Sequence, residues 1–189
     1  MMKTRTVCQF VLAITVLSQS ADLSADEGQL WKEVALLSHS QPLGRSETIA
    51  KEFAAKRNTS VKKLIAILRN TRLSKSRRVA AARMLGVLRA SEAVDDLLQQ
   101  LTLMPDLSDE CVFLCQVALI QIGKPASRKA LLLLQKKNSP LRTMLLREIV
   151  KQVEGRDVAI FLVRAEINSI QNPEARARMN AVLKQLSKR

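Results

Sequence analysis

Apolar side chains recur every three or four residues along most of the chain, and short polar breaks separate the apolar runs. In the segment 58–70, for example, Val61, Leu64 and Leu68 fall on one face of a helix. The breaks are rich in Pro, Gly, Asn and Ser, which favour turns. The pattern predicts helices at residues 27–37, 46–56, 58–70, 76–88, 91–103, 109–122, 124–137, 140–153, 156–170 and 174–186.

Capping residues mark several of these boundaries. Ser46 and Ser60 stand at the starts of two predicted helices, where a hydroxyl can accept a hydrogen bond from a free backbone N–H group. Gly86, Gly123 and Gly155 follow apolar runs, and glycine is favoured just after the last turn of a helix. We therefore expect each of these glycines to end a helix.

The composition agrees with an all-helical fold. Apolar residues make up 47% of the 189 residues, which is enough for the core of one domain of ordinary size. Aromatic residues contribute only 3%, and runs of β-branched and aromatic residues typical of strands are scarce. We expect a core of Leu, Ile, Val, Ala and Met.

One short pattern recurs along the chain, and its clearest copy is RRVAAARMLG at residues 77–86. Positions equivalent to Arg78 occur at Cys115, Arg142 and Arg176, in steps of 37, 27 and 34 residues. The mean step of about 33 residues fits one helical hairpin. The recurring positions are Arg78, Ala81, Ala82, Leu85, Gly86, Ala118, Ile122, Gly123, Arg142 and Arg176.

The stretches RRVAAARMLG and CQVALIQIGKPA resemble the short HEAT-like repeats of phycobilin lyases and of many other bacterial proteins. The family pattern is roughly V-R-x-x-A-A-x-A-L-G followed by a helix rich in leucine, and the resemblance covers about 60–189. It implies a right-handed α-solenoid of stacked antiparallel helical hairpins. Cys115 replaces the arginine of the pattern, and Leu145 and Leu146 replace its alanines, so we expect uneven curvature.

Helix packing gives a physical reason for the same pattern. Ala81 and Ala82 let two helices approach closely because a small side chain does not hold the backbones apart. We expect Gly86 to end this helix so that 76–88 and 91–103 form a hairpin. The run ALLLL at 130–134 is apolar around most of a helix, so we expect neighbouring helices to cover it on several sides.

The first 25 residues have the layout of a secretory signal peptide. Lys3 and Arg5 precede an apolar run at 7–17, which is too short to span a bilayer comfortably, and small and polar residues follow. We predict a signal peptide at 1–25, N-terminal capping helices at 26–58 and a repeat array at 59–189. The mature chain would lack a membrane span and lie in the periplasm or outside the cell; an uncleaved N-terminal anchor is the alternative.

The formal net charge of +14 favours an anionic partner. If the second helix of each hairpin lines a concave face, that face carries a mostly basic track, interrupted by Asp95 and Asp96. Its predicted binding residues are Lys62, Lys63, Arg69, Arg128, Lys129, Lys136, Lys137, Arg156 and Arg164. The expected function is an exported, non-enzymatic scaffold that binds a protein partner through this face, and an acidic segment of the partner would suit its charge. Nucleic acid or an anionic polymer is the alternative, although export and the lack of aromatic residues for base stacking disfavour nucleic acid.

No catalytic, metal or cofactor site is predicted. The sequence lacks the common zinc-protease, serine-hydrolase and phosphate-loop motifs. Cys111 and Cys115 are expected to be small core residues, and His39 is the only histidine. Asp95 and Asp96 begin a helix, where acidic residues favour the helix dipole. A lyase activity is implied only by the fold resemblance.

The signal peptide gives a direct prediction about the mature protein. Cleavage within 20–25 should leave a chain that starts in this interval, because the small residues there follow the apolar run. N-terminal sequencing of the protein purified from an exported fraction measures this. An intact start at Met1 in a cytosolic fraction would contradict the predicted localisation.

Overall fold

The computed structural model describes residues 28–34, 47–103 and 110–188. The chain divides into two compact units, Met1–Ser60 and Val61–Arg189. The described residues are overwhelmingly helical and contain no strand, so the prediction of an all-helical chain is confirmed for them. The predicted signal segment and His39 lie outside the described residues.

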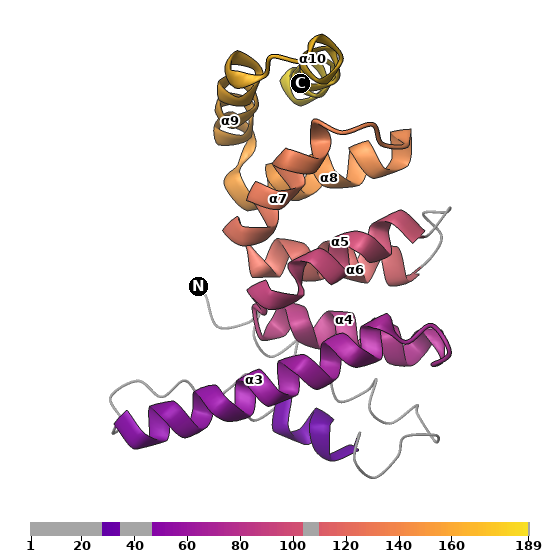
Figure 1. Ribbon diagram of the computed structural model, residues 1–189, viewed down its shortest axis with the longest axis vertical. Coiled ribbons are helices and arrows are strands. Elements are labelled where there is room, and N and C mark those ends of the chain that lie inside the picture. Colours follow the sequence, from indigo (N-terminus) through magenta and orange to yellow (C-terminus); the bar gives the residue numbers. More distant parts are fainter. Residues whose placement is uncertain (1–27, 35–46, 104–109, 189) are drawn as a thin grey trace, which may run out of the picture. The chain divides into compact units, whose positions relative to one another are not determined.

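The helices follow the predicted boundaries closely (Figure 1). They are α3 (Glu47–Arg69), α4 (Lys75–Val87), the 3-10 turn η1 (Ser91–Ala93), α5 (Val94–Leu103), α6 (Glu110–Ile122), α7 (Lys124–Leu134), α8 (Pro140–Glu154), α9 (Arg156–Ser169) and α10 (Pro173–Ser187). Residues 28–34 form a further helix. The largest difference at a helix end in the second unit is at α7, which stops three residues before the predicted end at 137.

The predicted break between 46–56 and 58–70 is wrong, because α3 runs through it as one helix. Ser60 was expected to cap a new helix; it lies inside α3 and is buried, and its hydroxyl has no hydrogen-bond partner. Thr59 donates its hydroxyl to the carbonyl of Ala55 at 3.0 Å. This bond is compatible with an uninterrupted helix, in which a threonine hydroxyl can donate to the carbonyl four residues earlier.

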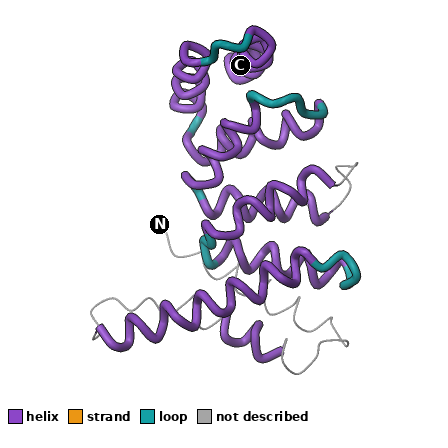
Figure 2. The backbone as a smooth tube through the Cα atoms, viewed as in Figure 1, coloured by secondary structure: helices purple, strands orange, loops and turns teal. Residues whose placement is uncertain are grey.

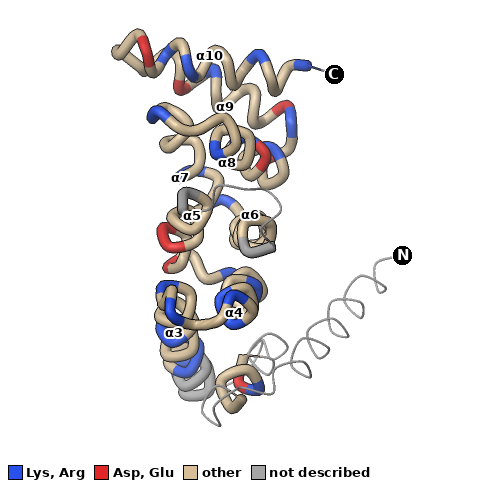
Figure 3. Tube along the Cα trace, turned by 90° about the vertical axis from the view of Figure 1, so that its right-hand side faces the viewer, with Lys and Arg blue, Asp and Glu red and all other residues tan. Residues whose placement is uncertain are grey.

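Within the second unit the helices pack in two rows (Figure 3). One row is formed by α4, α6 and α8, which contact one another in sequence, and α10 also packs on α8. In the other row, α5 contacts α7. Between the rows, α5 packs on α6, α7 on α8, and α9 on α10. The expected hairpin of α4 with α5 is not the main contact, because α4 packs chiefly against α6.

Aliphatic side chains form the core of this unit. Leu64, Leu97, Leu119, Leu146 and Ile149 are among its completely buried residues. No aromatic side chain is buried among the described residues of this unit, in which both phenylalanines are exposed. The described residues include no helix with the length and apolar character needed to cross a bilayer.

Short links join successive helices of the second unit (Figure 2). Gly123 alone separates α6 from α7, and Gly155 alone separates α8 from α9. Their φ angles are +86° and +81°, in a region that glycine adopts without the steric cost of a Cβ atom. The prediction that these two glycines end helices is therefore confirmed.

The prediction that Gly86 ends its helix is wrong. Gly86 lies within α4, and the chain turns at Arg89, which has a φ angle of +48°. Ala90 N–H donates to the Leu85 carbonyl at 3.0 Å and Arg89 N–H donates to the Gly86 carbonyl at 2.9 Å. These two bonds form the usual C-terminal cap of a helix, with an arginine at the position that glycine normally takes.

Gly86 instead permits a close approach between α4 and α6. A Cβ atom at this position would lie 2.7 Å from Ala118 Cα and 3.0 Å from Ala118 Cβ. It would also lie 2.4 Å from the side-chain oxygen of Gln121. Ala81 and Ala82, which were predicted to let two helices approach closely, are completely buried. Gly86 follows them in α4 and contacts α6.

Substitutions at Gly86 and at Arg89 should change the free energy of unfolding in opposite directions. Gly86→Ala should lower the free energy of unfolding by about 1–3 kcal/mol, because the new methyl group meets the backbone of Ala118. Arg89→Gly should raise it by about 0.5–1 kcal/mol by relieving the left-handed conformation. Urea unfolding of each variant measures both changes. Val87→Ala, at an exposed neighbour, is the matched control; a stabilising Gly86→Ala would contradict the close contact.

Candidate functional site

The predicted basic residues lie mainly at the surface. Eight of the nine are exposed, and Arg156 is half-buried. They belong to the C-terminal part of α3, to α7 with its following link, and to α9. Their side chains have different surroundings, so the structure does not form one uniform basic track from them.

Arg69 is committed to an ion pair with Asp96 of α5. Arg69 Nε donates to Asp96 Oδ1 at 2.5 Å and Arg69 Nη2 donates to Oδ2 at 3.1 Å. The Asp96 side chain is only 7% exposed, whereas that of Arg69 is 67% exposed. The hydrogen bonds and the charge of Asp96 raise the pKa of Arg69. The pair satisfies a buried carboxylate, which would be costly to leave alone.

Lys129 forms the equivalent contact from the other side of α5. Its Nζ lies 2.5 Å from Asp95 Oδ2. Both side chains are well exposed, at 46% for Lys129 and 73% for Asp95, so this pair contributes little to stability. It nevertheless balances the charge of Asp95.

The acidic interruption of the predicted basic track is therefore neutralised. Asp96 pairs with a cation on α3 and Asp95 with a cation on α7. Because the two carboxylates are bound to different helices, they do not form the paired acid and base of a hydrolytic site. Both lie in the first turn of α5, as predicted.

Arg156 binds the end of the last helix. Its Nε donates to the carbonyl of Leu186 at 3.0 Å, and its Nη2 donates to those of Ser187 and Lys188 at 2.9 Å. Carbonyl groups at a helix C-terminus carry partial negative charge and lack partners in the helix. Arg156 therefore joins α9 to α10. These hydrogen bonds occupy N–H groups that a partner would otherwise contact.

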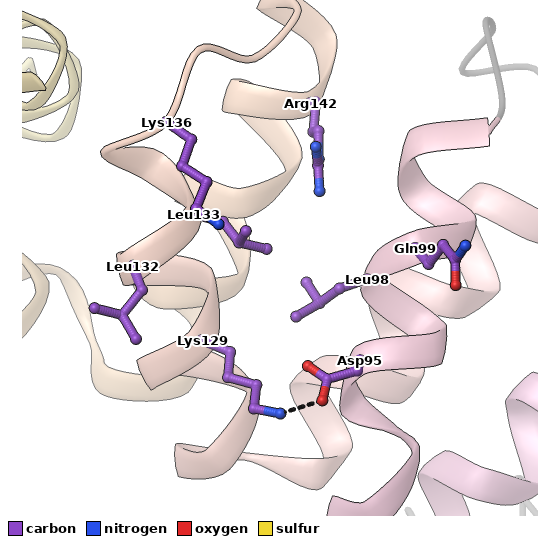
Figure 4. Close-up of a pocket in the computed structure, with 8 residues that line it drawn as sticks. All are labelled: Asp95, Leu98, Gln99, Lys129, Leu132, Leu133, Lys136 and Arg142. Carbon is purple, nitrogen blue, oxygen red and sulfur yellow. Dashed lines mark hydrogen bonds and ion pairs between the residues drawn. The ribbon is translucent and has the colours of Figure 1, made fainter.

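A groove lies between α5, α7 and α8, with a volume of about 340 Å³. Figure 4 shows the Asp95–Lys129 pair at one end of it, and Arg142 reaching in from α8 at the other. The lining residues are Asp95, Leu98, Gln99, Lys129, Leu132, Leu133, Lys136 and Arg142. The groove thus combines an apolar floor with two cations, Lys136 and Arg142, and neither of them forms an ion pair in the described part of the chain.

Arg142 is held in the first turn of α8. Ser139 caps this helix by accepting a hydrogen bond from the Arg142 backbone N–H at 3.2 Å, and Pro140 takes a position that favours helix initiation. The Nε atom of Arg142 is buried and has no hydrogen-bond partner. Burial lowers the pKa of this guanidinium.

The three arginines of the repeat pattern do not share one environment. Arg78 has a buried Nε without a hydrogen-bond partner. Arg176 of α10 donates to the carbonyl of Ile170, the C-cap residue of α9, from Nε at 3.1 Å and from Nη2 at 2.6 Å. Arg142 lines the groove. Arg78 and Arg142 thus share a buried Nε without a hydrogen-bond partner, whereas Arg176 does not, and the structural role of the three positions between repeats stays a prediction.

The groove contains residues that sequence reasoning missed. Leu132 was expected to be covered by neighbouring helices, but it is 55% exposed. Lys129 lies three residues before it on the same face of α7, and Lys136 lies four residues after it in the link that follows the helix. The sequence showed this spacing. That Leu98 and Arg142 also line the groove depends on how α5 and α8 pack.

The described residues show two features of their possible metal ligands and cysteines. They contain no group of three or more His, Cys, Asp and Glu side chains able to hold a metal ion. Cys115 is completely buried, as expected for a small core residue.

No protein family model, no curated protein and no solved structure matches the chain.

The two ion pairs of α5 should differ in their contribution to stability. Asp96→Asn should lower the free energy of unfolding by about 1–3 kcal/mol, because it replaces a buried acceptor of two charged hydrogen bonds. Asp95→Asn is the matched control and should cost less than about 0.5 kcal/mol, because its pair is exposed. Urea unfolding at neutral pH measures both, and equal losses would contradict the assignment.

Proposed function

We propose that this chain is an exported, non-enzymatic HEAT-like α-solenoid that binds a protein partner through the exposed face of its second helices. The alternation of helices with short links and the two packed rows of the second unit support the solenoid. The repeat pattern at residues 77–86 and the layout of residues 1–25 support the HEAT-like class and the export.

The observation that carries this proposal is the mixed character of the α7 face. Arg128, Lys129 and Lys136 are exposed there around Leu132, which is itself 55% exposed. A helix face that contacts only water gains no stability from a large exposed apolar side chain among its charged residues. Positive charges around an apolar centre are suited to a protein surface that presents acidic and apolar residues together.

The neighbouring second helix has the same character. On α9, Phe161 is 69% exposed and Val158 is 47% exposed, and the exposed Arg164 lies three residues after Phe161. Exposed aromatic residues are enriched at the centres of protein interfaces. An array that presents Leu132 and Phe161 on successive second helices has the anchors that a protein partner needs.

Charge reversal on the α7 face tests the proposal. The triple variant Arg128→Glu, Lys136→Glu and Lys137→Glu leaves the Asp95–Lys129 pair intact. It should reduce recovery of the partner from an extract of exported proteins by about tenfold, because it repels an acidic surface. Affinity capture with quantitative mass spectrometry measures the recovery.

The control carries the same change in net charge at other positions. Arg83→Glu, Lys124→Glu and Lys184→Glu lie outside the predicted binding residues, and this variant should retain the partner. Equal recovery with both triple variants would contradict binding through the α7 face. Capture of no specific protein by the native chain would contradict the proposed function as a whole.

Nucleic-acid binding is the second candidate, and the net charge of +14 favours it. Lys and Arg suffice for phosphate contacts, and such binding weakens steeply with salt. A gel shift with labelled DNA and RNA at low salt separates the two candidates. The protein-scaffold proposal requires that neither nucleic acid is retained in a strongly salt-dependent way.

A further inference from the structure

We propose that the groove between α5, α7 and α8 receives an acidic side chain of the partner protein together with an adjacent apolar side chain. Arg142 and Lys136 would bind the carboxylate, and Leu98, Leu132 and Leu133 would contact the apolar neighbour. This inference rests on the proposed function, because it names the chemistry that the α7 face recognises.

The first argument comes from the state of Arg142. Its Nε atom is buried without a hydrogen-bond partner, and no ion pair to its guanidinium exists in the described part of the chain. Burial alone accounts for the lowering of its pKa. The guanidinium of Arg142 is only partly buried and has no counter-charge, so a carboxylate of the partner can form charge-assisted hydrogen bonds with it.

The second argument comes from the charge around the groove. Lys136 adds a second cation at its rim, where it is exposed. The carboxylate of Asp95, which could otherwise repel an anion, is held by Lys129. The groove therefore presents net positive charge where Arg142 enters it, and a neutral pair at its far end (Figure 4).

The third argument comes from the floor and the size of the groove. Leu98 is buried beneath it, whereas Leu132 is exposed at its side. A volume of about 340 Å³ lies at the small end of ligand pockets. It suits one or two side chains of a docked segment. No aromatic ring lines the groove, so it lacks the platform on which a nucleic-acid base would stack.

Short peptides test the chemistry directly on the full-length chain. The probes are acetyl-Leu-Glu-Leu-amide and its Gln counterpart, which differ only in the carboxylate. NMR titration of the ¹⁵N-labelled protein follows the backbone signals and the Nε–H signal of Arg142, which Arg142→Lys identifies by its disappearance. We expect the Glu peptide to shift the Arg142 signal and to bind about tenfold more tightly than the Gln peptide.

Substitutions in the groove should weaken this binding selectively. Arg142→Gln should reduce the affinity for the Glu peptide by about tenfold, and Lys136→Gln by a few-fold. Leu132→Ala should weaken both peptides alike, because it removes apolar contact only. Lys124→Gln on α7 and Arg147→Gln on α8 are matched controls outside the groove and should change the affinity by less than about twofold.

Thermal unfolding separates loss of binding from loss of fold. Because Arg142 has no partner for its buried Nε, Arg142→Gln should melt at the temperature of the native chain or above it. A large decrease in the melting temperature would show a structural role for Arg142 and would overturn the assignment.

Two results would overturn the carboxylate site. One is equal affinity for the Glu and Gln peptides. The other is a shift of the Arg142 signal by inorganic phosphate with no response to the Glu peptide. Partner capture distinguishes this inference from the proposed function: capture that Arg142→Gln leaves unchanged would remove the groove but not the scaffold, whereas peptide binding without any captured partner would remove the scaffold but not the groove.

Discussion

The contact between Gly86 of α4 and Ala118 of α6 sets the distance between these two helices. A Cβ atom at Gly86 would lie 2.7 Å from the backbone of Ala118, so these two helices are closer than larger residues would allow. Because α6 also packs on α5, α7 and α8, its position affects each of its neighbours. The small residues at this contact therefore determine how closely α4 and α6 approach each other.

Polar contacts between the second helices complement this apolar packing. Arg69 binds Asp96 and joins α3 to α5, and Lys129 binds Asp95 and joins α7 to α5. Gln135 donates to Glu166 at 2.8 Å and joins the end of α7 to α9. Only the first of these contacts includes a buried carboxylate. The others align the surfaces of successive helices more than they stabilise the fold.

Arg142 departs from this arrangement, because its guanidinium reaches a groove and its Nε atom has no partner. The same groove leaves Leu132 exposed beside Lys129 and Lys136. One region of α5, α7 and α8 therefore combines apolar surface with cationic charge, and the neighbouring acidic residues are already paired.

The sequence by itself determined the helices and most of their ends, because a period of three to four residues and the breaks at Gly123 and Gly155 are local properties. It also indicated which exposed residues are basic. Only the tertiary structure decided that α3 is continuous, that Gly86 serves packing, and that Arg142 enters a groove while Arg176 binds the end of α9. These outcomes depend on which helices lie side by side, and a helix with apolar residues on several faces, such as α7, does not specify its neighbours.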